Sequence, residues 1–82
     1  MARFEILMFA AARELSGTDL LVVEMESPIA AGEIMNRIGE IVPAIAPILP
    51  ACRLAVDQSF VGSEALVDAG AEVALIPPVS GG

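Results

Sequence analysis

The apolar residues of this chain change their spacing along the sequence, and those changes limit the folds it can adopt. Residues 3–9 and 18–26 place apolar side chains at alternate positions, as a strand with one buried face does. The isoleucines of residues 34–41 then recur at the three- and four-residue spacing of a helix. Alternation returns in residues 53–57 and 72–76. This order predicts an α+β fold in which one main helix packs on one face of a mixed sheet.

Glycine and proline residues mark where the predicted elements end. Gly17 ends a short helical turn over residues 11–15, and the strands on either side of that turn should pair with each other. Pro43 ends the main helix near Val42. Residues 44–51 are then expected to form an apolar loop or single turns divided by prolines.

The main helix carries isoleucines on one side and charged residues on the other. Ile34, Ile38 and Ile41 share a face that should pack against the sheet. Glu33 and Arg37 are spaced for an exposed ion pair one turn apart. We therefore expect tertiary packing through the isoleucines to hold this helix in place.

Polar turns connect the last strands. Residues 57–59 predict a hairpin turn that leads to Phe60, and residues 68–70 predict a further turn before the final strand, which two prolines stop. Strand, strand, helix and short strands in this order are the β-grasp arrangement. We expect one such domain over residues 1–82, with residues 77–82 as an extended C-terminal tail.

The apolar content of the chain exceeds what a small core can hold. Hydrophobic residues make up 56% of its 82 residues, so some of them should face solvent or a partner. Leu7, Phe9 and Ile76 fall on strand faces that also carry charges, and Phe60 follows a turn. The alternative is that a loop or a helix end covers these four side chains. An exposed apolar cluster ringed by charge is typical of a protein-binding patch, and we expect a partner there.

Charge and the missing residue types exclude several functions. Eleven acidic residues oppose four arginines, and the net charge of −7 disfavours nucleic-acid binding and suits docking against a basic protein face. Lysine and histidine are absent, which excludes Schiff-base chemistry, imidazole catalysis and the commonest metal ligand. We therefore expect no metal site, no bound cofactor and no nucleic-acid partner.

The single cysteine and the longest apolar run favour a location inside the cell. Cys52 lies among apolar neighbours and is interpreted as a small buried hydrophobe rather than a nucleophile. One cysteine forms no internal disulfide, which suits a reducing compartment. The apolar run over residues 41–52 is interrupted by prolines and is too short to span a membrane. We expect a cytoplasmic protein without a membrane anchor.

The C-terminal tail begins with two prolines and ends with two glycines, which carry no side chains. Pro77 and Pro78 stiffen its start, and the glycines at Gly81 and Gly82 allow it to thread a narrow channel. Such a tail delivers its terminal carboxylate, which must be activated, for example by adenylation, before a nucleophile such as sulfide can displace the leaving group. Terminal glycines also occur in disordered tails, so the tail by itself leaves that alternative open.

Three segments of the sequence resemble the small subunits of molybdopterin synthases, a family of sulfur carriers with a ubiquitin-like β-grasp fold. They are residues 9–17, 54–57 and 72–82, which read FAAARELSG, LAVD and EVALIPPVSGG. The last segment is the most specific, because thiazole-pathway sulfur carriers and ubiquitin-like modifiers share the two glycines but usually lack the preceding Pro-Pro-Val-Ser. The resemblance covers essentially the whole chain.

The resemblance implies that the reactive group is the C-terminal carboxylate and not a side chain. An ATP-dependent activating enzyme adenylates Gly82 in such carriers, and sulfur transfer converts it to a thiocarboxylate. The tail, in which Gly81 precedes the reactive end, then enters the large synthase subunit. There it gives sulfur to cyclic pyranopterin monophosphate, which becomes the dithiolene of molybdopterin. Catalytic side chains are expected on the large subunit.

The resemblance also implies two partner proteins. One is the large synthase subunit, in a heterotetramer of two small and two large subunits, and the other is an adenylyltransferase similar to ubiquitin-activating enzymes. Phe60 and Ile76 match the docking positions of the family, and Phe9 and Arg13 lie near them. The full set of expected partner-binding residues is Phe60, Ile76, Phe9, Leu7, Arg13, Pro77, Pro78 and Val79.

Three other functions stay open on the sequence alone. The first is a ubiquitin-like modifier that is joined through Gly82 to lysines of other proteins. The second is a sulfur carrier of another pathway, such as thiazole synthesis for thiamine. The third is a passive β-grasp interaction module whose C-terminus has no chemical role.

Overall fold

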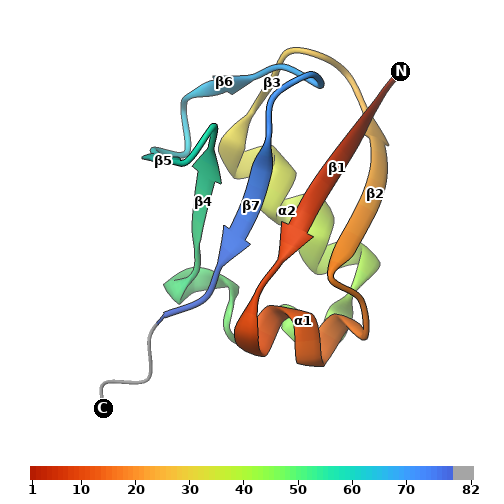
Figure 1. Cartoon of the computed structure of the whole chain (residues 1–82), viewed down its shortest axis with the longest axis vertical. Helices are drawn as coiled ribbons and strands as arrows, with labels where there is room; N and C mark the ends of the chain where they lie inside the picture. The colour runs from red at the N-terminus through yellow and green to blue at the C-terminus, as the bar shows by residue number, and fades with distance from the viewer. Residues whose placement is uncertain (79–82) are drawn as a thin grey trace.

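The structure is a computed structural model that describes residues 1–78, and it contains a five-stranded mixed sheet with helix α2 (Ala31–Ile41) on one face (Figure 1). The first and last strands, β1 (Ala2–Met8) and β7 (Val73–Ile76), lie side by side and run parallel. The other neighbours are antiparallel, and the full order is β2 (Leu20–Met25), β1, β7, β4 (Arg53–Val56) and β5 (Ser59–Val61). This architecture confirms the predicted α+β class and β-grasp arrangement.

Two helices accompany the sheet, and both end where the sequence predicts. α1 (Ala10–Ser16) ends at Gly17, whose φ of 75° is left-handed and whose N–H donates to the carbonyl of Arg13 over 2.9 Å. α2 (Ala31–Ile41) ends at Val42, directly before a proline. In the part of the chain that the structure describes, neither helix is long and apolar enough to cross a membrane.

The hydrophobic core lies between α2 and the sheet. Ile34 and Ile38 of α2 are fully buried in one cluster with inward-facing strand residues such as Phe4, Ile6 and Leu75. Burying an apolar side chain of this size contributes roughly 1.5–3 kcal/mol to the free energy of unfolding. Packing through the isoleucine stripe therefore holds α2 on the sheet, as its spacing predicts.

Two details of the helix prediction are wrong. Ile41 is 47% exposed, because it is the last residue of α2 and Ile45 of the following turn is buried in the core instead. The predicted ion pair between Glu33 and Arg37 is absent from the described residues, where Arg37 pairs with Glu40 over 3.6 Å. Residues three and four apart are both neighbours on a helix surface, so spacing alone does not select between the two glutamates.

The proline-rich segment after α2 forms two short 3-10 turns, η1 (Pro43–Ile45) and η2 (Leu49–Ala51), as the sequence predicts. Its apolar side chains close the core, since Ile45 is fully buried and Leu49 packs against the same cluster. A Cβ added at Gly39 of α2 would lie only 2.7 Å from Cδ1 of Leu49. The glycine in the helix therefore leaves room for η2 to approach.

A second, two-stranded sheet has no counterpart in the sequence prediction. It pairs β3 (Ile29–Ala30) with β6 (Leu66–Val67) in antiparallel register. Val67 is buried in the core, whereas Leu66 is 70% exposed. Strands of two residues are too short to show an alternating pattern, so periodicity does not reveal them.

The predicted hairpin between β4 and β5 has a two-residue turn. Asp57 and Gln58 both have positive φ, at 51° and 69°, as a type I′ turn requires. The Asp57 carboxylate accepts a hydrogen bond from the N–H of Glu72 over 3.0 Å, and the Asp57 N–H donates to the Glu72 carbonyl over 2.8 Å. Asp57 thus connects the turn to the start of β7.

Replacing Gln58 by glycine is expected to stabilise the fold. A left-handed conformation costs a residue with a Cβ roughly 1–2 kcal/mol, whereas glycine adopts it without steric cost but loses more entropy on folding. We expect Gln58→Gly to raise the free energy of unfolding, measured by urea denaturation, by about 0.5–1 kcal/mol. Asp57→Ala is the control with the opposite expected effect: it should lower the free energy of unfolding, because it keeps the positive φ and removes the acceptor for the Glu72 N–H. A lower stability of Gln58→Gly would contradict the assigned turn.

Candidate functional site

The face of the sheet that points away from α2 carries a row of apolar side chains across all five strands. The register places Leu7 of β1 opposite Leu20 of β2 and Ala74 of β7. Ala74 in turn lies opposite Ala55 of β4, which lies opposite Phe60 of β5. Residues that are paired in register point to the same face of a sheet, so these five side chains are neighbours on the open side.

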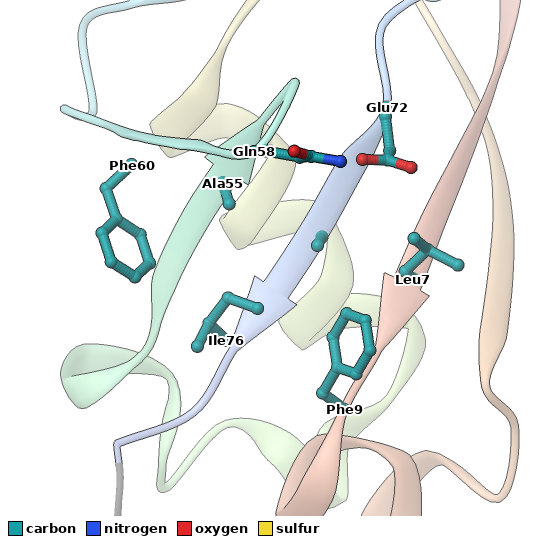
Figure 2. Close-up of a pocket in the computed structure, with 8 residues that line it drawn as sticks. Leu7, Phe9, Ala55, Gln58, Phe60, Glu72 and Ile76 are labelled. Atoms are coloured by element: carbon teal, nitrogen blue, oxygen red, sulfur yellow. The ribbon is translucent and has the colours of Figure 1, made fainter.

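Four members of this row, all except Leu20, line an open groove (Figure 2). Ala55 and Ala74 are small and leave a hollow, while larger side chains rise around them. In Figure 2, Phe60 stands on one side and Leu7 and Phe9 on the other. The full lining is Leu7, Phe9, Ala55, Gln58, Phe60, Glu72, Ala74 and Ile76.

The structure brings together the four side chains that the sequence assigns to an apolar patch. Leu7, Phe9, Phe60 and Ile76 all line the groove. Phe9 is 46% exposed and Phe60 is 51% exposed, and the other two are half-buried. The alternative that a loop or helix end of the described chain covers the two aromatic rings is therefore wrong. Their contact with a partner stays a prediction.

The alanines of the groove are not among the site residues predicted from the sequence. The alternation of residues 72–76 places Ala74 on the same face as Ile76, but only the strand register shows that Ala55 lies beside it. Gln58 and Glu72 also line the groove, at the end nearest the β4–β5 turn. Glu72 and Ala74 can be assigned to the open face from the sequence, because they alternate with Val73 and Leu75. Ala55 and Gln58 can be assigned to the groove only once the order of the strands in the sheet is known.

Other predicted partner-binding residues lie outside the groove. Arg13 is exposed on α1 and lines a separate shallow depression with Asp19 and its neighbours, so it is not part of the groove lining, and its place near the docking patch stays a prediction. Pro77 is buried and Pro78 is exposed. The remaining predicted site residues, Val79, Gly81 and Gly82, lie outside the described residues.

The lining of the groove is mostly apolar. Among its described lining residues, Glu72 is the only one with an ionisable side chain, so no pair of groups is placed to exchange a proton. Within residues 1–78, no cluster of three or more acidic or cysteine side chains is placed to hold a metal ion. The chemical capacity of the groove is therefore to accept apolar side chains of another molecule.

Cys52 is placed as the sequence predicts, as a small buried hydrophobe. Its side chain is part of the core cluster and the residue is 8% exposed. Its Sγ lies 3.3 Å from the carbonyl of Ile48 and can donate to it. Burial raises the pKa of the Cys52 thiol, which makes the thiolate, the reactive form, less available.

The pH dependence of stability provides a test of this burial. Because the folded chain has the higher pKa, the neutral Cys52 thiol contributes stability below its usual pKa of 9.0 that is lost as the pH rises through the folded value. We expect the unfolding free energy to fall more steeply above about pH 9 in the unaltered chain than in Cys52→Ala. A thiol reagent should react slowly with the folded chain and rapidly in urea. Equal rates in the two states would contradict the burial.

Comparison with known proteins shows similarity over nearly the whole chain. The family described as the ThiS family matches residues 6–82. The molybdopterin synthase sulfur carrier subunit of Chlamydomonas reinhardtii is 34% identical over 83 residues, which cover 98% of this chain and 99% of that protein. The protein of the same name from Dictyostelium discoideum is 30% identical, with 98% and 96% covered.

Solved structures share the fold. The H. volcanii small archaeal modifier protein 1 superposes with a TM-score of 0.84 at 21% identity, covering 96% of this chain and 100% of that one. A chain from the complex of subunits 1 and 2 of molybdopterin-converting factor from Helicobacter pylori gives a TM-score of 0.69 at 17% identity, with 98% and 99% covered. At these identities the likeness supports the β-grasp fold and nothing finer.

Proposed function

Since this chain belongs to the ThiS family, we propose that it is a sulfur carrier subunit of molybdopterin synthase. The two relatives described above bear that name and are similar to this chain over nearly its whole length. The structural observation that best supports the proposal is the position of the groove. Ile76 lines the groove and lies only six residues before Gly82, so a partner seated there is held next to the segment that carries the reactive end.

The proposed chemistry takes place on the main-chain carboxylate of Gly82. In the activating enzyme the carboxylate attacks the α-phosphate of ATP, and pyrophosphate leaves. A sulfide-equivalent donor then attacks the acyl carbon of the adenylate and displaces AMP, which leaves a thiocarboxylate. In the synthase, the thiocarboxylate sulfur forms a bond to cyclic pyranopterin monophosphate, and water cleaves the acyl carbon–sulfur bond, which restores the Gly82 carboxylate. ATP is thus bound by the activating enzyme, and the carrier itself holds no cofactor.

The large synthase subunit is the proposed occupant of the groove. The Helicobacter pylori neighbour was solved as a complex of two subunits of molybdopterin-converting factor, which supports a partner of this kind. A pterin phosphate is anionic and this chain has a net charge of −7, so the basic groups that bind the substrate belong on the large subunit. We propose a heterotetramer of two small and two large subunits.

The activating enzyme is proposed to be an adenylyltransferase similar to ubiquitin-activating enzymes. It requires access to the same C-terminal segment, so it and the large subunit bind the carrier in turn. ATP-dependent activation and a reduced Cys52 thiol both suit the cytoplasm, where we propose that the carrier works. The glycines at Gly81 and Gly82 allow close approach of both enzymes to the backbone.

Intact mass measurement tests the carrier chemistry. We expect the chain that is coexpressed with its activating enzyme and a sulfur source to gain the mass difference between sulfur and oxygen, because one carboxylate oxygen is replaced. The matched control is a chain that lacks Gly82, which should keep its original mass under the same conditions. Molybdenum cofactor synthesis should be lost with that control.

Two other outcomes would replace the carrier proposal. Adducts with the mass of whole proteins, joined through Gly82, would support a ubiquitin-like modifier. A thiocarboxylate that restores thiazole synthesis but not molybdenum cofactor synthesis would assign the carrier to the other pathway. An unchanged mass, together with intact cofactor synthesis after Gly82 deletion, would leave a passive interaction module.

Phe60→Asp tests the groove as the docking site. Phe60 is half exposed and its ring forms one wall, so a carboxylate there places a charge within an apolar contact. We expect Kd for the large subunit, measured by calorimetry, to rise about 100-fold or more, as for other aromatic anchors. The circular dichroism spectrum should stay native, because no core contact is removed.

Leu66→Asp is the matched control for this substitution. Leu66 is also an exposed apolar residue, at 70%, but it belongs to β6 and does not line the groove. We expect its Kd to equal that of the unaltered chain. Equal loss of affinity in both variants, or in neither, would remove Phe60 from the interface.

A further inference from the structure

Arg53 begins β4 and stands at the rim of the groove. Its neighbour Leu54 is buried, so Arg53 points to the open face together with Ala55. The register places Arg53 opposite Ile76. Its guanidinium carbon lies 4.0 Å from the centroid of the Phe60 ring. Arg53 thus contacts one wall of the groove at the end where β7 leads toward the C-terminus.

The guanidinium of Arg53 is stacked on an aromatic ring but is not neutralised by the described part of the chain. Arg3 pairs with Glu5 over 3.2 Å and Arg37 pairs with Glu40 over 3.6 Å, whereas no carboxylate of residues 1–78 comes within 4 Å of Arg53. Stacking occupies the flat face of a guanidinium and leaves the N–H groups along its edge free to donate. The edge of Arg53 is therefore available to an acceptor outside these residues.

The two ends of the groove differ in charge. Glu72 and Gln58 lie at one end (Figure 2), and the Asp57 carboxylate is hydrogen-bonded to the main chain of Glu72 there. Arg53 lies at the opposite end, beside Ile76. A partner that is complementary to both ends must present a positive group to the first and a negative group to the second. The charges therefore distinguish the two ends of the groove and favour one orientation of a partner, which the apolar lining alone would not do.

We propose that Arg53 is a specificity-determining residue that binds a carboxylate of the large synthase subunit. This inference rests on the function proposed above, because it names the chemistry of that partner. The carboxylate accepts two N–H groups from the edge of the guanidinium, and the ring of Phe60 holds the guanidinium plane in position. The ion pair orients the partner along the groove relative to the strand that leads to Gly82.

Local pairing and overall charge predict opposite effects of one substitution. Arg53→Gln removes one positive charge, so the net charge changes from −7 to −8. Long-range attraction to a basic partner would then strengthen binding, whereas loss of an ion pair weakens it. Arg37→Gln makes the same change of net charge on α2, away from the groove, and is the matched control.

The test is calorimetric titration of the purified large subunit with the full-length chain and its variants at two salt concentrations. We expect Arg53→Gln to raise Kd about tenfold or more and to reduce its salt dependence. Arg53→Glu should raise Kd further, because it repels the carboxylate of the partner. Arg53→Lys should retain part of the affinity, because the positive charge stays but the two parallel N–H donors of the guanidinium are lost. Arg37→Gln should bind at least as tightly as the unaltered chain.

The outcomes separate this inference from the function on which it rests. If Arg53→Gln binds as tightly as Arg37→Gln while Phe60→Asp does not bind, the groove docks the partner without Arg53, and the inference is overturned although the function stands. Equal affinities of Arg53→Gln and Arg53→Glu, with unchanged salt dependence, would show that Arg53 acts only by packing on Phe60 and would also overturn it. Failure of the unaltered chain to bind would overturn both.

Discussion

The parallel pairing of β1 with β7 is the contact on which the rest of the structure depends. It joins the first strand of the chain to the last, and β7 also pairs with β4, so the N-terminal and C-terminal hairpins become one sheet. Parallel strands end on the same side, which brings Phe9, just after β1, to the same end as Ile76. Without this pairing neither the core under α2 nor the groove on the opposite face would be complete.

The sequence predicted the elements of the fold better than their arrangement. Alternation and helical spacing identify strands and α2, because burial on one face leaves a repeating pattern. The same argument identifies Leu7 and Ile76 as outward-facing. It does not identify Ala55 or Arg53 as their neighbours, because those contacts depend on which strands pair and in which register. The two-residue strands β3 and β6 leave no pattern at all.

Charge and apolar packing are kept apart in this chain. The described core contains no buried polar or charged side chain. Stability therefore rests on apolar burial, and the charged groups of the described residues remain on the surface. The stacking of Arg53 on Phe60 is a point where the two kinds of surface meet.

The alanines of the groove floor have a consequence for natural variation. The depth of the groove is set by side-chain volume that is missing at Ala55 and Ala74, not by any group that is present. Ala55 is half-buried, so a larger residue there adds atoms to the open face and removes none from the core beneath it, whereas Ala74 is only 8% exposed and has little room for added atoms. Inherited changes at Ala55 would therefore leave the core contacts in place, so that a screen for unstable variants would overlook a position where added side-chain volume fills the groove.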